Sequence, residues 1–170
     1  MSIVKLNNRG VRSATTFGSI TGLGSMIFLS KQTASSSSTI SFTSGIDSTY
    51  KEYLFTFKNI NPATDNVTFG FQANAAGGSG YNETITSTLF CCFHDEADTG
   101  GGTFLNYQTA RDQAQGTDFQ MLGYRLGNGS DENSCGFLHL FNPAGTVGVK
   151  HFTAKLAHYD YEDMSFNSFI

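Results

Sequence analysis

The chain is poor in several residue types, and each shortage excludes a class of protein. It has no Trp, only 2 Pro among 170 residues, and 14% charged residues, where a typical soluble domain has roughly a quarter. Its uninterrupted apolar runs are too short for a membrane-spanning helix. The N-terminus also lacks the continuous apolar core of a signal peptide. We therefore expect a single domain that is made in a cytoplasm and has no membrane contact.

Cysteine is also scarce. Cys91, Cys92 and Cys135 are odd in number, and two of them are adjacent, where a bridge would be strained. This excludes a disulfide framework and predicts buried free thiols in a reducing compartment.

Aromatic residues are plentiful, and many alternate with polar ones. There are 16 Phe and 7 Tyr, and the run Tyr53 to Lys58 shows the period of two that a strand with one buried face requires. Turn signals recur at roughly ten-residue intervals. The sequence predicts an all-β, antiparallel β-sandwich of the jelly-roll type over residues 26–170, preceded by an extended arm over residues 1–25.

The expected strands follow this alternation. They cover residues 26–29, 40–43, 53–58, 67–71, 81–94, 119–126, 136–141, 148–159 and 165–170, and residues 107–115 would tolerate one helical turn. In residues 137–141 both faces are apolar. That pattern predicts a central strand covered on both sides.

Charge is distributed unevenly along the chain. Residues 1–46 contain four basic and no acidic residues and carry +4, whereas six basic and fourteen acidic residues give the remainder −8. This asymmetry indicates that the arm lies on an acidic surface, of its own domain or of a neighbouring subunit. A solvated, frayed terminus is the alternative. The predicted docking residues are Lys5, Asn8, Arg9 and Arg12.

Residues with catalytic or metal-binding chemistry form no recognisable set. Cys92 and His94 share one face of an expected strand, as half of a metal site would, but no second pair has matching spacing. Calcium-loop, nucleophile-elbow and phosphate-loop spacings are absent. A carboxylate pair for glycoside hydrolysis stays open, because the fold sets its separation. We expect no enzyme, no cofactor, no metal and, at a net charge of −4, no direct nucleic-acid binding.

Two pairs of loop residues admit two interpretations. Tyr81 with Asn82, and Asn106 with Tyr107, have rings and amides that could stack on a sugar and bind its hydroxyls. Tyrosine is equally enriched where subunits pack together. The sequence favours packing at an interface, with recognition of a host surface glycan as the alternative.

Four segments, taken in order, are similar to one group of known proteins. They are Lys5-Leu6-Asn7-Asn8-Arg9-Gly10-Val11-Arg12, Phe17-Gly18-Ser19-Ile20, Tyr50-Lys51-Glu52-Tyr53-Leu54-Phe55-Thr56-Phe57 and Gly136-Phe137-Leu138-His139-Leu140-Phe141-Asn142-Pro143. These segments resemble small virion-associated proteins of marine tailed phages, above all phages of cyanobacteria.

The resemblance implies a structural component of the head or tail of a virion and no catalytic residues. We accordingly expect localisation in the virion, other virion proteins as partners, and a homo-oligomer that is a trimer or part of a lattice. A receptor-binding fibre that recognises host glycan is the alternative. Members of the group continue beyond Phe169-Ile170 with two further strands. If this chain ends there, a neighbouring copy is expected to complete the sheet edge.

Overall fold

The chain divides into two units, and the first contains the basic arm. In the computed structural model, which describes residues 26–97 and 104–170, the chain divides into Met1–Gly45 and Ile46–Ile170. Residues 26–45 form no strand, so the strands expected over 26–29 and 40–43 are wrong. Each stretch has only four residues and buries too little surface to fix a strand without a sheet beside it. The predicted arm, with Lys5, Asn8, Arg9 and Arg12, lies outside the described residues.

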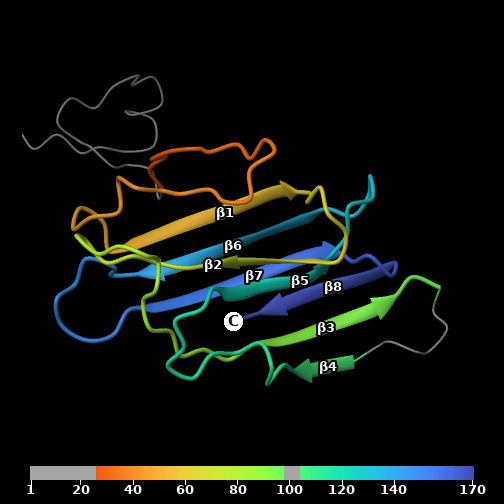
Figure 1. Cartoon of the computed structure of the whole chain (residues 1–170). Helices are drawn as coiled ribbons and strands as arrows, with labels where there is room; N and C mark the ends of the chain where they lie inside the picture. Colours follow the sequence, from red (N-terminus) through yellow and green to blue (C-terminus); the bar gives the residue numbers. More distant parts are fainter. Residues whose placement is uncertain (1–25, 98–103) are drawn as a thin grey trace, which may run out of the picture. The chain divides into compact units, whose positions relative to one another are not determined.

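The second unit is all-β and antiparallel (Figure 1). Its strands are β1 (Glu52–Ile60), β2 (Val67–Phe71), β3 (Phe90–Asp95), β4 (Phe104–Tyr107), β5 (Gln120–Leu126), β6 (Ser134–Phe141), β7 (His151–Tyr159) and β8 (Met164–Phe169). None of the described residues forms a helix that is long and apolar enough to cross a membrane.

The strands make two sheets packed face to face. The large sheet has the order β1-β6-β7-β8-β3-β4, and the small sheet pairs β2 with β5. The predicted antiparallel sandwich is confirmed. Its jelly-roll topology stays a prediction, because the strands divide six to two between the sheets. The C-terminal β8 is paired on both sides, and the edges of the large sheet are β1 and β4.

Aromatic side chains fill the space between the sheets. Phe57 of β1 meets Phe69 of β2 edge to face at 5.0 Å, and Phe71 of β2 meets Phe152 of β7 at the same distance. Around them lie the buried side chains of Leu122, Leu138 and Ala154. Edge-to-face rings bury large areas and hold the two sheets in one arrangement.

One glycine lets adjacent strands of the large sheet approach closely. A Cβ atom on Gly136 in β6 would lie 2.1 Å from the carbonyl oxygen of Lys155 in β7 and 2.9 Å from Cα of Leu156. No side chain fits there, so β6 needs glycine at this position.

The strand over residues 137–141 differs from its prediction in one respect. It lies inside the sheet, between β1 and β7, but only its inward face is buried, and Phe137 is 39% exposed. Apolar residues on both faces predict burial on both faces. The structure instead leaves Phe137 exposed on the outward face and His139 and Phe141 partly exposed.

Candidate docking surface

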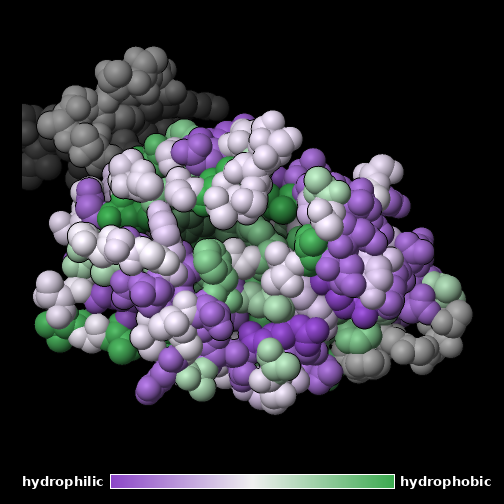
Figure 2. Space-filling model, in the orientation of Figure 1, coloured by the Kyte–Doolittle hydropathy of each residue, from purple (hydrophilic) through white to green (hydrophobic). Residues whose placement is uncertain are grey.

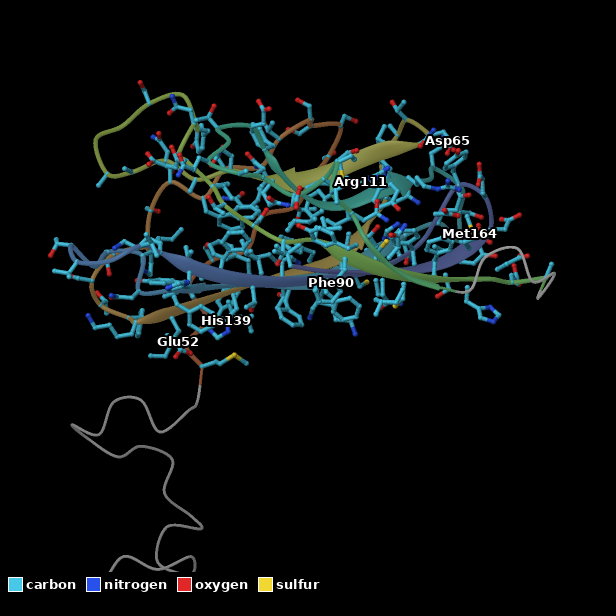
Figure 3. All side chains as sticks on the ribbon, turned by 90° about the horizontal axis from the view of Figure 1, so that it is seen from below. Glu52, Asp65, Phe90, Arg111, His139 and Met164 are labelled. Carbon is cyan, nitrogen blue, oxygen red and sulfur yellow. The ribbon has the colours of Figure 1, made fainter. Side chains whose placement is uncertain are left out.

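The outward face of the large sheet carries a continuous row of side chains, one from each strand. The strand registers align them in the order Thr56, Phe137, Lys155, Phe169, Phe90 and Tyr107, from β1 to β4. Successive residues of a strand point to opposite faces, so all six project away from the small sheet. Figure 3 shows Phe90 on this lower side, together with His139 and Glu52, while Arg111 and Asp65 lie on the other side.

A second row runs beside the first and has almost no charge. It contains Cys135, Ala157, Asn167, Cys92 and Leu105, from β6 to β4. Together the rows expose much of their apolar surface. The large side chains on this face are exposed by 45% at Leu54, 42% at Phe90, 70% at Leu105, 49% at Tyr107 and 39% at Phe137. An apolar face of this extent marks an interaction surface.

The first row is ordered by contacts within the sheet. The ring of Phe90 stacks on that of Phe169 at 5.9 Å between centroids, and the Lys155 ammonium lies 5.2 Å from the Phe169 ring. At the β4 edge, the Tyr107 hydroxyl donates to the carboxylate of Asp112. This hydrogen bond raises the pKa of Tyr107. The row therefore holds one cation near its middle and one carboxylate at its end.

Acidic side chains gather at one end of the sandwich. The β1–β2, β5–β6 and β7–β8 connections and the end of β3 all lie there, because the strands are antiparallel. These segments carry Asp65, Asp95, Glu96, Asp131, Glu132, Asp160, Glu162 and Asp163. Figure 2 shows hydrophilic side chains gathered at this right-hand end. We call this set the acidic end.

Only part of the acidic end is neutralised by neighbouring cations. Arg125 donates its Nε to Asp160 at 2.8 Å and also pairs with Glu162. Hydrogen bonds from Tyr161 and Arg125 lower the pKa of Glu162. The Tyr159 hydroxyl donates to Glu96, which raises the pKa of Tyr159. One arginine among so many carboxylates leaves a negative potential.

A polar network is buried between the sheets. Gln108 Nε2 donates to the Sγ atom of Cys91 at 3.1 Å, and the Tyr124 hydroxyl lies 3.7 Å from the same sulfur. Arg111 Nη1 donates to Gln108 Oε1 at 2.7 Å, and its guanidinium lies 3.6 Å from the centroid of the Tyr124 ring. Burial, with the Cys91 contact, raises the pKa of Tyr124 to about 12. The network satisfies buried polar groups and fixes the β3–β5 contact.

The tyrosine and asparagine residues predicted for an interface or a glycan lie in two places. Tyr81 and Asn82 belong to the irregular segment before β3, whereas Asn106 and Tyr107 end β4. Asn106 pairs with Cys91 and Tyr107 with Phe90, so these two side chains point to opposite faces. No hydrogen bond or ring contact among the described residues joins the two pairs. Only Tyr107 lies on the outward row.

The candidate metal-binding residues also lie on the outward face. Cys92 and His94 share that face, and the ring of His94 contacts the Asp95 carbonyl oxygen at 2.7 Å through Nδ1. Within residues 26–97 and 104–170, no three His, Cys, Asp or Glu side chains form a group that could hold a metal. All three cysteines are free; Cys91 is buried, but Cys135 is exposed, so the prediction of buried thiols is wrong for Cys135.

The outward row was missed in the sequence, although one signal for it was present. Phe137, Phe169 and Phe90 occupy strand positions that alternate with buried residues. Polar residues are usual at such positions when one face of a sheet is in water, so exposed aromatic ones there favour contact with another molecule. Their alignment into one row depends on the strand order, which spacing along the chain does not determine.

Comparison with known proteins does not assign the chain to a family. No family model matches the chain, and no curated protein or solved structure is significantly similar to it.

Proposed function

We propose that the protein is a structural component of a phage virion, which assembles with copies of itself and is held in the particle by its N-terminal arm. The virion assignment rests on the resemblance of four sequence segments to virion-associated proteins of marine tailed phages. The assembly role rests on the outward face of the large sheet, whose exposed apolar side chains favour contact with another protein.

Charge supports the role of the arm. Lys5, Arg9 and Arg12 belong to a segment without a single acidic residue, and the acidic end offers carboxylates on several adjacent loops. Arginine binds carboxylates with two parallel hydrogen bonds and is suited to this contact. In this proposal the arm of one subunit binds the acidic end of the next.

A glycan-binding fibre tip is the second candidate. Exposed Tyr81 and Tyr107 leave aromatic rings available for stacking on a sugar. However, the two tyrosines lie on different segments without a shared contact, and Tyr107 already belongs to the outward row. The geometry therefore favours assembly.

Deleting residues 1–25 tests the proposed function. We expect particles assembled with the truncated protein to contain far fewer copies, measured by quantitative mass spectrometry of purified particles. Replacing Lys5, Arg9 and Arg12 together by Gln should have the same effect, because the charges are removed while the length is kept. Lys31→Gln is the matched control and should leave the copy number unchanged. Normal incorporation of both arm variants contradicts the proposal.

A further inference from the structure

We propose that the outward face of the large sheet binds the same face of a second copy around a twofold axis that runs along the strands between β8 and β3. This inference rests on the proposed assembly function and names the contact between copies. In such a dimer Phe169 faces the partner's Phe90, and each pair occurs twice because the contact is isologous.

The charge of Lys155 determines where the axis lies. An axis through the middle of the sheet, between β7 and β8, would place Lys155 beside its own symmetry mate, and like charges there repel. Moving the axis by one strand separates the two ammonium groups and places each over Tyr107 of the other copy. The Tyr107 hydroxyl is bonded to the carboxylate of Asp112. Lys155 then meets an aromatic face and a carboxylate, which are the partners that a lysine prefers.

The second row fits the same axis. Leu105, which is 70% exposed, comes to lie over Ala157 of the other copy, and Asn167 lies over Cys92. A small side chain opposite a large one lets the two faces interdigitate, as the inner faces of a sandwich do at a separation of about 10 Å. Among the side chains of the large sheet whose exposure is described, Leu105 is the most exposed large apolar one, and it is thereby covered.

The overlapping area indicates a weak dimer. Four strands, β7, β8, β3 and β4, overlap; strands about 4.8 Å apart and about six residues long project on the order of 400 Å² per copy. Uneven side chains raise the accessible area above that projection. The contact still lies near the lower limit of specific interfaces, about 1,200 Å² in total. We therefore expect a concentration-dependent dimer, which many neighbouring contacts in a particle would reinforce.

Charge exchange in the full-length chain tests the contact by analytical ultracentrifugation over a concentration series. Lys155→Asp and Asp112→Lys should each weaken self-association by about tenfold or more, because every reversal occurs twice in the dimer. The double variant should recover the wild-type association, since each pair is restored with its signs exchanged. Leu105→Lys should abolish the dimer, whereas Val149→Lys, at a position 78% exposed in the β6–β7 loop, should not. Circular dichroism and thermal melts confirm that the variants are folded.

Several results would overturn the inference. They are a monomer at every concentration, unchanged association of Leu105→Lys, and failure of the double variant to recover. The Leu105→Lys variant could also be missing from particles while its self-association is unchanged. That result would assign the outward face to a contact with another virion protein and would reject the contact with a second copy. A monomeric protein that is incorporated normally leaves the proposed function standing. A dimer that never enters particles supports the contact and rejects that function.

Discussion

A buried histidine connects the stability of the fold to pH. His158 of β7 contacts the Tyr124 carbonyl oxygen through Nε2 at 2.9 Å and stacks on Phe166 at 4.9 Å. Its Nδ1 atom and the Oγ atom of Ser134, its neighbour across the strands, have no hydrogen-bond partner among the described residues. Burial lowers the pKa of His158 from 6.5 to about 4, because the protonated ring would carry its charge into the space between the sheets.

Acid should therefore destabilise the fold in a defined window. The unfolded chain binds a proton near pH 6.5 and the folded one only near pH 4. The contribution of neutral His158 to the free energy of unfolding is fully present above pH 6.5. It is lost as the pH falls from 6.5 to about 4, and the loss levels off below that pH. The difference corresponds to about 3 kcal/mol in the free energy of unfolding. Urea denaturation at a series of pH values measures it.

A substitution isolates this effect from other titrating groups. In His158→Gln the decline between pH 6.5 and pH 4 should nearly vanish, although the variant is less stable at pH 7. His151→Gln, at an exposed position of the same strand, should keep the wild-type pH profile. If His158→Gln declines as steeply as the wild type, another group is responsible.

At the scale of elements, the turn between β7 and β8 depends on one buried carboxylate. Asp160 is fully buried. Its Oδ1 accepts hydrogen bonds from the amides of Glu162 at 2.9 Å and Met164 at 3.0 Å, and its Oδ2 accepts from Arg125. The carboxylate thus closes the turn and connects it to β5.

Asp160→Asn should destabilise the protein by about 3 kcal/mol, because the new amide group turns a donor toward existing donors and removes the buried negative charge that Arg125 contacts. Asp163→Asn, in the exposed part of the same turn, is the matched control and should change stability by less than about 0.5 kcal/mol. Chemical denaturation measures both. Equal effects of the two substitutions would show that the turn does not depend on Asp160.

The sequence predicted the position of most strands of the second unit, but not every place where regular pairing stops. Residues 67–71 match β2, and 53–58 lie within β1. The stretch 81–94 was expected to be one long strand with a bend. In the structure only Phe90–Asp95 is a strand, and Ile85 makes an isolated bridge to Gly116. Gly116 and Ile85 exchange both of their backbone hydrogen bonds. This contact is between segments far apart in the chain, so the alternation of residues 81–94 alone does not reveal it.

Strand β4 was missed, and with it the two residues that it adds to the candidate surface, Leu105 and Tyr107. Its four residues, Phe104–Tyr107, are too short to show a period, and the strand exists because β3 offers an edge to pair with. Tyr107 was selected from residue type alone, and the structure places it on the outward row, 49% exposed; its role at an interface stays a prediction. Its neighbours Phe90 and Phe169 could not be selected, because the row depends on which strands are adjacent.

At the scale of the whole molecule, the two proposed contacts differ in their physical nature. The outward face is apolar and has few charges, so its association is driven mainly by removing apolar surface from water. The contact between the basic arm and the acidic end depends on opposite charges, and exposed charges are screened by salt. Ionic strength should therefore separate the two contacts within one protein.

Raising the salt concentration from 0.1 M to 1 M shortens the screening length from about 10 Å to about 3 Å. We expect self-association through the outward face to persist or tighten in sodium sulfate, which strengthens the burial of apolar surface. Higher-order species held by the arm should dissociate under the same conditions. Sedimentation velocity at both salt concentrations distinguishes the two contacts. The Leu105→Lys variant removes the contact through the outward face, and the variant with Lys5, Arg9 and Arg12 replaced by Gln removes the contact through the arm. The opposite outcome is a dimer that dissociates at high salt even when the arm charges are removed. It would mean that the outward face binds through charge and that the apolar rows do not hold the copies together.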